Sequence, residues 1–530
     1  HNIIGFDIPV LEDLTSFKLG DQTLIDTLVF SRLFNPVREG GHSLAVWGSK
    51  LGLGKIEFEE FSFYSDEMLE YCKRDVALNV KVYKALQREG VGFSKDSMFL
   101  EQDVAKILKD QQRHGFYFDE YKANMLLALM REKMKEAENE VSKVFKPKVD
   151  NRLIYRRETK GGEIAKTGTW DNPSGKGVRL TEEEHDYLSQ GANFKTSRTT
   201  VVDFNIGSRK QIGEYLLDFG WKPKEFTVNG RPVVNEKTLS AITGIPQAEL
   251  IKDYLMFQKR EAQVKSWIGS VKEDGRVHGF VIHNGTITGR CVHREPNMAQ
   301  VPNSNSPYGK ECRECWTVPE KCKLVGIDAS GLELRMLAHY MNDEDYTNEI
   351  INGDIHTHNQ TIAGLKSRSE AKTFIYALCY GAGNNRLSEI LGGSSTHAAG
   401  VRKHFLDNLP SFKSLKDKVG RASADGFLKG LDGRKLFVRS EHSALNTLLQ
   451  GAGAIVMKKA LVIFNEYIED MDAHFVCNVH DEWQVEAGAD IADEVGMLGV
   501  KAIKEAGEHF NLNCPLDGEY NVGSNWSETH

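Results

Sequence analysis

The sequence predicts a multi-domain α/β protein, and three observations lead to that class. With 530 residues, the chain is longer than a single hydrophobic core usually supports. Its 40% apolar and 27% charged residues are typical of folded globular proteins. From about residue 276 onward, short apolar runs alternate with longer amphipathic stretches, which indicates strands alternating with helices.

The composition leaves the class of function open. The 8 cysteines are scattered, which is typical of a reducing compartment, and we expect a cytoplasmic protein. The net charge of -8 does not decide for or against nucleic acid, because phosphate binding depends on local basic patches. No apolar run approaches the ~18–20 residues of a membrane-spanning helix. The chain begins at His1 without a signal-peptide pattern, and we expect that an upstream segment is missing.

In the first half of the chain, one irregular segment interrupts the helical periodicity. An apolar stripe predicts a helix over 66–88, and residues 100–145 predict two helices separated by 115–119. Residues 146–206 hold several glycines and few apolar periods, so we expect a loop-rich insertion whose first part is basic. Helical patterns resume at 208–219 and 236–268.

After residue 276, the expected strands and helices alternate. Strands are predicted at 277–282, 324–327, 436–438, 475–479 and 483–485. Helices are predicted at 331–341, 368–380, 396–407, 443–468 and 489–508. Three of these segments carry residues whose chemistry indicates a functional site.

The first such segment is the apolar strand that ends at Asp328. A helix follows almost at once, with Leu332, Leu334 and Leu337 available for packing. A carboxylate at the end of a buried strand is held rigidly and faces a crevice, which suits a ligand of a divalent metal ion. Taken alone, Asp328 also fits the simpler role of capping the following helix.

The second segment is His480-Asp481-Glu482, which lies between two β-type runs. This pattern predicts a hairpin with two acids at its tip, although a solvated turn fits the same residues. Together, Asp328 and Asp481 would lie on neighbouring strands. There they could hold two Mg²⁺ ions ~3.5–4 Å apart, the arrangement used for in-line phosphoryl transfer.

The third segment is a predicted helix with one face made of Arg368, Lys372, Tyr376 and Tyr380, which recur every four residues. The basic residues come first and the aromatic residues follow. A triphosphate could therefore meet the cations while the base and sugar meet the rings. An ordinary amphipathic helix with a solvated basic end is the simpler interpretation of this segment by itself.

In this order, the three segments resemble motifs A, B and C of family A DNA polymerases, the group that includes bacterial DNA polymerase I. Motif B of that family has Arg, three residues, Lys, then an aromatic residue and Tyr-Gly, as in 368–381. Further stretches resemble the replicative polymerases of short-tailed phages, at 286–290, 296–302, 306–309, 353–357, 431–435 and 444–450. The resemblance covers nearly the whole chain and is densest after residue 280.

The resemblance implies a right-hand polymerase with palm, fingers and thumb, preceded by a truncated RNase H-like 3′–5′ exonuclease domain. The implied boundaries are 1–95 for the partial exonuclease, 96–280 for the thumb, 281–350 and 431–530 for the palm, and 351–430 for the fingers. The implied activity is template-directed addition of dNTPs to the 3′ end of a DNA primer, in a phage-like replicative setting. We expect a monomer without membrane contact, with two Mg²⁺ ions per site and Mn²⁺ as a substitute.

The resemblance also implies roles for individual residues. The catalytic metals would be bound by Asp328, Asp481 and the Ala329 carbonyl. The triphosphate would be held by His356, Arg368 and Lys372, of which Lys372 would also donate a proton to the leaving pyrophosphate. The minor groove or backbone of primer–template DNA would be contacted by Arg290, Asn446, Gln450 and His480. Minor-groove contacts of this kind sense shape rather than sequence.

Three further residues would meet the nucleoside part of the dNTP. Tyr376 would pack on the incoming sugar, and its hydroxyl would fill the space of an absent 3′-OH, which implies tolerance of dideoxynucleotides. Glu333 would lie under that sugar and exclude a 2′-OH. Tyr380 would stack near the templating base.

The amino-terminal part resembles a proofreading exonuclease without its first motif. Residues 1–7, which end at Asp7, are similar to the second motif, and Tyr71-Cys-Lys-Arg-Asp75 fits the third. Asp7 and Asp75 would bind metal, and Tyr71 would orient the attacking water. The first motif, Asp-x-Glu, should lie before His1, so we expect weak or absent 3′→5′ exonuclease activity in this chain.

The insertion lies where short-tailed-phage polymerases carry a thumb insertion, which in one type grips host thioredoxin. Residues 146–206 are therefore expected either to bind a thioredoxin-like processivity factor or to form a solvated surface loop. Separately, Cys312-x-x-Cys315 with Cys322 permits a zinc site, although a convincing fourth ligand is lacking.

Two other functions remain open at this point. A single-subunit RNA polymerase shares the palm with two aspartates, but Glu333 beside Tyr376 favours deoxyribose. A non-catalytic DNA-binding replication factor would not need both acids together with Arg368 and Lys372.

Overall fold

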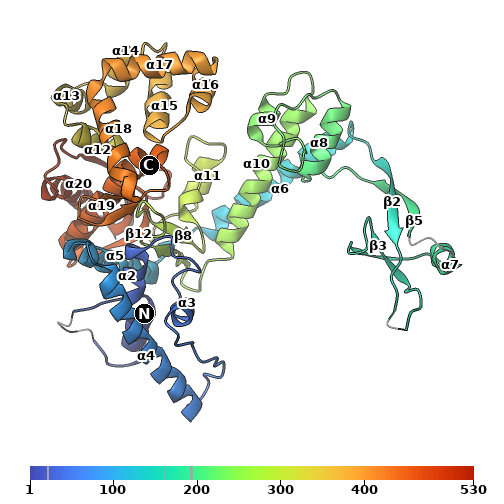
Figure 1. Ribbon diagram of the computed structural model, residues 1–530, viewed down its shortest axis with the longest axis horizontal. Helices are drawn as coiled ribbons and strands as arrows, with labels where there is room; N and C mark the ends of the chain where they lie inside the picture. Colours follow the sequence, from blue (N-terminus) through green and yellow to red (C-terminus); the bar gives the residue numbers. More distant parts are fainter. Residues whose placement is uncertain (19, 21–22, 160, 191–194) are drawn as a thin grey trace. The chain divides into compact units, whose positions relative to one another are not determined.

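The computed structural model describes residues 1–18, 20, 23–159, 161–190 and 195–530, in which helices and strands are mixed (Figure 1). The described chain divides into two compact units. One contains residues 1–123 and 266–530, and the other contains residues 124–265. Lys160 and residues 191–194 of the expected insertion lie outside the described residues.

The first unit is built around a four-stranded antiparallel sheet with the order β12-β13-β9-β14. Its strands are β9 (Cys322–Ala329), β12 (Ala473–Val479), β13 (Glu482–Gly488) and β14 (Gly518–Gly523). Side chains alternate between the two faces of a strand, so Ile327 and Trp483 point to the same covered face. Both are fully buried against the helices α19 (Glu441–Ile468) and α20 (Ala492–His509). Phe464 of α19 stacks on Trp483 with ring centroids 5.4 Å apart.

The predicted strands of this half are confirmed within a few residues, except for 277–282. That segment forms two short strands, β6 (Arg276–Val277) and β7 (Phe280–Ile282). It is split because the chain changes partners: β6 pairs with β1 (Phe116–Tyr117) and β7 pairs with β8 (Val292–Arg294). The predicted strand 436–438 overlaps β11 (Lys435–Phe437), which pairs with β10 (Phe427–Lys429).

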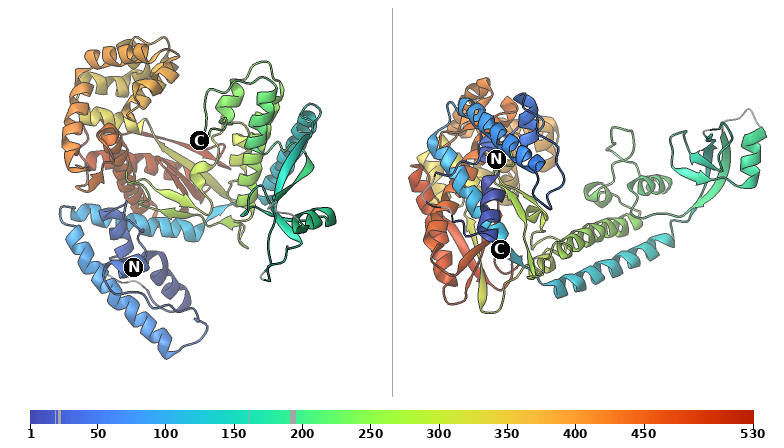
Figure 2. Two further views of the ribbon diagram at one scale, coloured as in Figure 1. Left: turned by 45° about the vertical axis from the view of Figure 1, so that its right-hand side comes forward. Right: turned by 90° about the horizontal axis from the view of Figure 1, so that it is seen from below.

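A group of helices follows β9 and gathers at one end of the first unit (Figures 1 and 2). These helices are α12 (Leu332–Met341), α13 (Glu344–Asn352), α14 (Ile355–Ala363), α15 (Arg368–Cys379), α16 (Asn384–Leu391), α17 (Ser395–Asn408) and α18 (Pro410–Ala422). Two short helical segments, η2 (Met298–Gln300) and η3 (Ser423–Asp425), and α11 (Gly309–Glu314) complete this half. Phe374 of α15 packs edge-on against Phe405 of α17 at 5.5 Å, so the apolar face of α15 is buried and its basic face stays exposed.

The amino-terminal helices belong to the first unit as well. They are the π-helical η1 (Ile3–Asp7), α1 (Ile8–Leu14), α2 (Thr27–Phe34), α3 (Leu44–Lys50), α4 (Asp66–Glu89) and α5 (Lys95–His114). Helix α5 packs against α19 and β12. The second unit spans 124–265, which lies within the expected thumb of 96–280.

A buried ionic network ties α5 to the sheet-covering helix α19. Glu101 of α5 is completely buried and accepts hydrogen bonds from Lys458 at 2.6 Å and from His283 at 2.7 Å. Arg434 pairs with Glu101 and also with Asp432. Burial alone would raise the pKa of Glu101, but Lys458 and Arg434 hold it well below its usual value. The network fixes α5, the 432–434 turn and α19 relative to one another within the first unit.

The second unit contains a helical part and a small sheet. Its helices are α6 (Glu120–Ser142), α8 (Arg209–Asp218), α9 (Glu236–Ser240) and α10 (Gln247–Ile268), packed around Phe145, Ile212 and Ile251. The predicted helix 236–268 is interrupted between α9 and α10, where Gly244 adopts a φ of 83° that does not continue a helix.

The expected loop-rich insertion is instead an ordered antiparallel sheet, which corrects that expectation. Its strand order is β4-β3-β2-β5, and α7 (Glu182–Gln190) lies against it. The strands are β2 (Lys148–Tyr155), β3 (Thr167–Trp170), β4 (Gly177–Arg179) and β5 (Lys195–Val202). The core is only a few residues, including Ile154 and Leu188, so most positions of this sheet are polar and the sequence pattern is weak.

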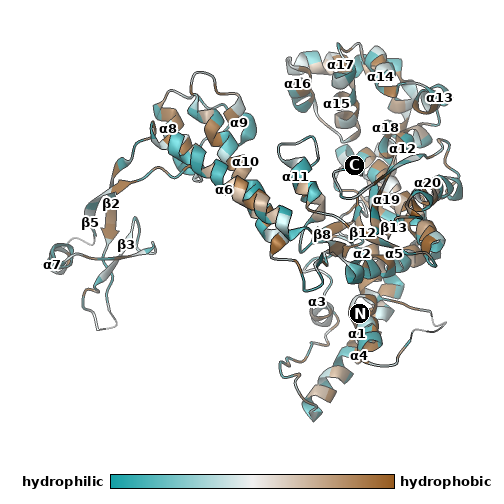
Figure 3. Cartoon of the chain, turned by 180° about the vertical axis from the view of Figure 1, so that it is seen from behind, coloured by the Kyte–Doolittle hydropathy of each residue, from teal (hydrophilic) through white to brown (hydrophobic). Residues whose placement is uncertain are grey.

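One helix among the described residues, α19, is long and apolar enough to cross a membrane by length and composition. However, 83% of its most apolar stretch is buried inside the protein, as expected of a core helix. In Figure 3, most other helices of the first unit carry hydrophilic and hydrophobic residues side by side, which is typical of helices with one buried face.

Candidate active site

Asp328 and Asp481 are brought together by the pairing of β9 with β13. In that register, Asp328 lies directly opposite Glu482, the first residue of β13. The N–H of Ala329 donates a hydrogen bond to the carbonyl oxygen of Asp481 at 3.1 Å. The two acids therefore lie at the same end of adjacent strands, and the backbone of Ala329 lies beside them.

A strained turn presents Asp481. His480 and Asp481 form the two-residue connection between β12 and β13, whose last pair is Val479 with Glu482. His480 has a φ of 58°, in the left-handed region that residues other than glycine rarely adopt. Such strain is retained mainly where the surrounding structure enforces it, and it is common at functional sites.

Asp328 is flanked by acids on both neighbouring strands. Glu482 faces it from β13, and Glu519 faces it from β14. Burial, followed by the charges of Asp481 and Glu482, raises the pKa of Asp328 to about 7. Burial also raises the pKa of Asp481. Since like charges this close repel one another, the site favours a bound cation.

Glu482 is held by other residues and is not available as a free carboxylate. It accepts hydrogen bonds from Trp526 Nε1 and Gln484 Nε2, each at 2.6 Å, and it pairs with His530 Nδ1 at 2.9 Å. Burial would raise the pKa of Glu482, but the bonds from His530 and Trp526 hold it below its usual value.

The remaining donor set fits a divalent cation with oxygen ligands. It consists of the carboxylates of Asp328 and Asp481 and the neighbouring backbone. Among the residues that the structure describes, no group of three or more His, Cys, Asp or Glu side chains is arranged to hold a metal ion. A site with two carboxylates is typical of Mg²⁺ sites that complete their coordination with water and phosphate oxygens.

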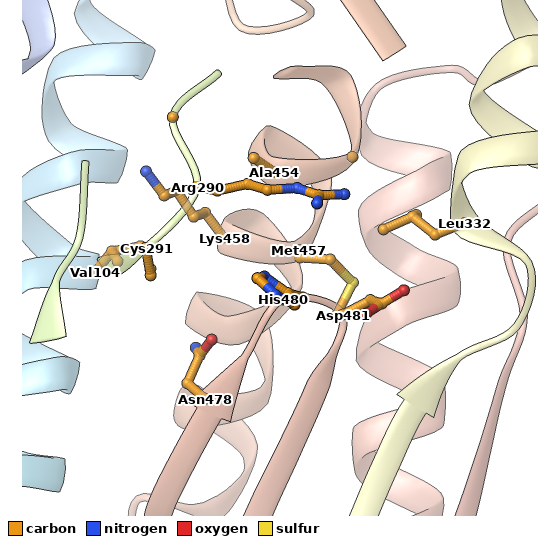
Figure 4. A pocket seen from close by; sticks show the side chains of 12 residues that line it. Val104, Arg290, Cys291, Leu332, Ala454, Met457, Lys458, Asn478, His480 and Asp481 are labelled. Carbon is orange, nitrogen blue, oxygen red and sulfur yellow. The ribbon is translucent and has the colours of Figure 1, made fainter. Parts of the chain in front are cut away.

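A pocket beside the acids is lined by Arg290, Leu332, Met457, Lys458, His480 and Asp481 (Figure 4). Arg290 donates a hydrogen bond to Glu333 at 3.0 Å, and the Tyr380 hydroxyl donates to the other carboxylate oxygen at 2.5 Å. Burial and this bond raise the pKa of Tyr380, so its hydroxyl stays protonated. Glu333 is therefore fixed between two residues that the sequence also predicts to belong to the site.

Helix α15 presents its predicted face next to α14. Arg368 and Lys372 are exposed, and Tyr376 is half-buried, with its ring 6.2 Å from that of His356. Burial, then the charges of Arg368 and Lys372, lower the pKa of His356, so this ring is neutral at pH 7. Its Nδ1 atom is buried without a hydrogen-bond partner among the described residues, so the hydrogen-bonding capacity of this atom is unused.

The two predicted DNA contacts on α19 share one face of that helix. Asn446 and Gln450 are four residues apart and half-buried. The Asn446 Oδ1 atom is buried and has no hydrogen-bond partner among the described residues. Arg290 and His480, the other two predicted DNA contacts, line the pocket of Figure 4.

The predicted exonuclease residues are not assembled into a metal site. Lys55 Nζ donates to the Tyr71 hydroxyl at 2.7 Å and pairs with Asp75 at 3.0 Å. Asp7 is exposed at the end of η1, and within the described residues no hydrogen bond or ion pair joins it to Asp75. A lysine thus occupies the space between Tyr71 and Asp75, a contact that sequence reasoning missed because Lys55 lies outside both motifs.

The structure also describes the three cysteines whose spacing permits a zinc site. Among the described residues, Cys312, Cys315 and Cys322 form no disulfide bond, and no metal-holding cluster occurs. Burial raises the pKa of Cys315 to about 12, which disfavours the thiolate that zinc requires.

Three residues of the site were not predicted from the sequence to belong to it. Glu519 faces Asp328 only through the β9–β14 register, and Lys458 reaches the pocket from the middle of α19. Asp354, which precedes α14, accepts a hydrogen bond from Arg368 Nε at 2.6 Å. An acid two residues before His356 is a helix-cap signal, but it does not indicate a partner fourteen residues away.

Two aspartates on paired strands, facing a helix with cations followed by tyrosines, place the protein in the class of nucleic-acid polymerases with a palm sheet. Comparison with known proteins defines the family. The family model described as DNA polymerase family A matches residues 179–528. The chain therefore belongs to DNA polymerase family A.

Individual relatives agree with this assignment. The chain is 32% identical to the DNA-directed DNA polymerases of Enterobacteria phage T3 and Escherichia phage T7, in both cases over 100% of this chain and 92% of the relative. The solved structure of the POL domain of Pol1 from M. smegmatis, in complex with DNA primer-template and dNTP, has a TM-score of 0.76 at 19% identity and covers 95% of this chain and 82% of that chain. The predicted fold class and template-directed DNA synthesis are confirmed, and the RNA polymerase and non-catalytic alternatives are set aside.

Because Asp328 lies close to other acids, we predict that Asp328→Asn stabilises the metal-free protein at pH 8. An acid whose pKa rises from ~3.9 in the unfolded chain to about 7 in the folded protein opposes folding once it ionises. The melting temperature in EDTA should therefore rise by a few degrees at pH 8 and by less at pH 5. Asp470→Asn, at an exposed position, is the control. An equal shift at both pH values, or a decrease at pH 8, would contradict this account of the charges.

Proposed function

We propose that Asp328 and Asp481 hold two divalent cations for DNA synthesis, that Mg²⁺ is the usual ion and that Mn²⁺ substitutes. One observation carries the proposal: the two acids lie at the ends of paired strands, and the pKa of each is raised. Bound cations would relieve the repulsion between the two carboxylates. When bound, the ions neutralise charge on the attacking 3′-hydroxyl and on the leaving pyrophosphate. The Ala329 carbonyl is a third ligand in this proposal.

The incoming dNTP is oriented by the chain's own side chains. Arg368 and Lys372 bind the β- and γ-phosphates, and the neutral His356 ring adds a hydrogen bond. Lys372 then donates a proton to the leaving pyrophosphate. Their exposure on adjacent helices and the unpaired Nδ1 of His356 support these roles.

The sugar lies against Tyr376 and Glu333. Burial and the charge of Glu333 raise the pKa of Tyr376 to about 12, so the phenol remains protonated and its hydroxyl occupies the space of an absent 3′-OH. This supports acceptance of dideoxynucleotides. Glu333, held by Arg290 and Tyr380, cannot swing aside easily and excludes a 2′-OH. Tyr380 stacks near the templating base.

Primer–template DNA lies along the pocket and the adjoining face of α19. Arg290 and His480 line the pocket, and Asn446 and Gln450 offer donors and acceptors to the minor groove. Since the minor-groove acceptors are nearly the same in all base pairs, these contacts bind DNA of any sequence.

Loss of either catalytic acid should abolish DNA synthesis. Asp328→Ala and Asp481→Ala are each expected to lower the rate of single-dNTP addition by ~10³-fold or more, because each removes a ligand of the proposed cations. Binding of primer–template should remain near that of the unchanged protein, as measured by fluorescence anisotropy. Asp470→Ala serves as the control. Unchanged extension in either acid variant would overturn the assignment.

The 3′→5′ exonuclease activity of this chain should be weak or absent. Lys55 pairs with Asp75, and no group of three or more His, Cys, Asp or Glu side chains that could hold a metal ion is found among the described residues. The measurement is release of nucleotides from labelled single-stranded DNA in Mg²⁺, made with the Asp328→Ala protein so that resynthesis does not interfere. Brisk degradation would contradict this expectation.

The insertion sheet is proposed to bind a processivity factor of the thioredoxin class. Val149 and Val201 are partners across β2 and β5, and both are exposed, at 69% and 70%. These two exposed apolar side chains, side by side on the sheet, are the observation that supports a protein partner. Phosphate contacts by the neighbouring basic residues would add a salt-dependent attraction to DNA.

Removing residues 148–203 tests the role of the insertion. Lys148 and Val202 are paired, so a short linker can close the gap while the separate core around Phe145 and Ile212 is kept. The deletion should shorten products per DNA-binding event in the presence of thioredoxin and leave single-nucleotide addition unchanged. Product length under single-encounter conditions is the readout. If the DNA products are equally long with and without the insertion sheet, the proposal is contradicted.

A further inference from the structure

Asp354 connects the two helices that carry the proposed phosphate-binding residues. It caps α14, where its Oδ1 atom accepts a hydrogen bond from the His356 N–H at 3.1 Å. Its Oδ2 atom accepts hydrogen bonds from the Thr357 hydroxyl at 2.8 Å and from Arg368 Nε at 2.6 Å. One carboxylate therefore joins the first turn of α14 to the first residue of α15.

The Arg368 guanidinium uses only one of its edges in this contact. Nε bonds to Asp354, whereas Nη1 and Nη2 make no hydrogen bond within the described residues. A guanidinium carries five N–H donors, and the pair of terminal nitrogens matches two phosphate oxygens. The contact with Asp354 thus leaves the phosphate-binding edge of Arg368 free and limits the directions in which it can point.

Stabilisation of the fold does not explain this ion pair. The side chains of Arg368 and Asp354 are 56% and 41% exposed, and ion pairs at such positions contribute little to stability because water screens them. Nevertheless, the bond from Arg368 holds the pKa of Asp354 far below its usual value, so the acid is ionised at every working pH. A long arginine side chain that is already ordered loses less conformational entropy when a ligand binds.

We propose that Asp354 is a positioning residue, which orders Arg368 and the first turn of α14 for the triphosphate of the incoming nucleotide. The inference rests on the proposed function of Arg368 and His356. A competing role, in which Asp354 occupies Arg368 until the triphosphate displaces it, disagrees with the free Nη1 and Nη2 atoms.

The test compares Asp354→Asn with the unchanged protein in single-nucleotide addition. Asparagine caps helices as well as aspartate does, so this variant keeps the bond to the α14 backbone at His356. It loses the oxygen that accepts from Arg368 and from the Thr357 hydroxyl. The KM for dNTP should rise about three- to tenfold, the effect of losing one charge-assisted hydrogen bond. The kcat and the Kd for primer–template should stay close to their original values, and so should the melting temperature.

The direction of the change in KM distinguishes a positioning role of Asp354 from the effect of removing its negative charge. Removing an acid near the triphosphate would by itself attract the nucleotide and lower its KM. An unchanged or lower KM for Asp354→Asn would therefore overturn the proposal. Asp343→Asn is the matched control, because Asp343 caps the neighbouring helix α13 through Tyr346 and has no bond to Arg368. Its KM should not change.

A double-mutant cycle ties the effect to Arg368. Arg368→Ala should raise the KM for dNTP, and adding Asp354→Asn to it should cause no further rise. Additive effects would overturn the inference about Asp354 alone. If Arg368→Ala leaves the KM unchanged, the proposed phosphate-binding role of Arg368 fails, and the inference about Asp354 fails with it. Failure of the inference alone gives a different result, a raised KM for Arg368→Ala with additive effects in the double variant.

Discussion

The chemistry of this polymerase depends on keeping two acids together that repel one another. Asp328 and Asp481 meet because β9 and β13 pair in one register, and that register is set by apolar side chains on the other face, where Ile327 and Trp483 are fully buried. A slip of one residue would turn Asp328 into the helix-covered face. The packing energy of the core thus maintains an electrostatically unfavourable arrangement that bound cations then relieve.

The nucleotide side of the site is organised differently, by polar contacts between partly exposed side chains. Glu333 is shared by Arg290 and Tyr380, and Asp354 is shared by α14 and Arg368. Such contacts add little to the stability of the fold, but they restrict long side chains before substrate arrives. The buried network around Glu101 supports both sides, because Lys458 connects α5 to the pocket beside the acids.

Local sequence patterns predicted the parts of the site that lie on continuous elements. The strand before Asp328, the hairpin at Asp481 and the face of α15 follow from apolar periodicity, which neighbouring residues determine. The hydrogen bond from Trp526 to Glu482 joins residues 44 positions apart, so no local sequence pattern predicts it. The insertion sheet was missed because β5 alternates between exposed and half-exposed residues and lacks an apolar face.

The central claim is that Asp328 and Asp481 share a pair of cations beside the nucleotide. The most direct measurement is a crystal structure of the protein with primer–template, a dideoxy-terminated primer, dNTP and Mn²⁺, examined for anomalous scattering. We expect two peaks beside the carboxylates of Asp328 and Asp481, with the triphosphate next to Arg368. Peaks elsewhere, or none between these two side chains while a dNTP is bound, would contradict it.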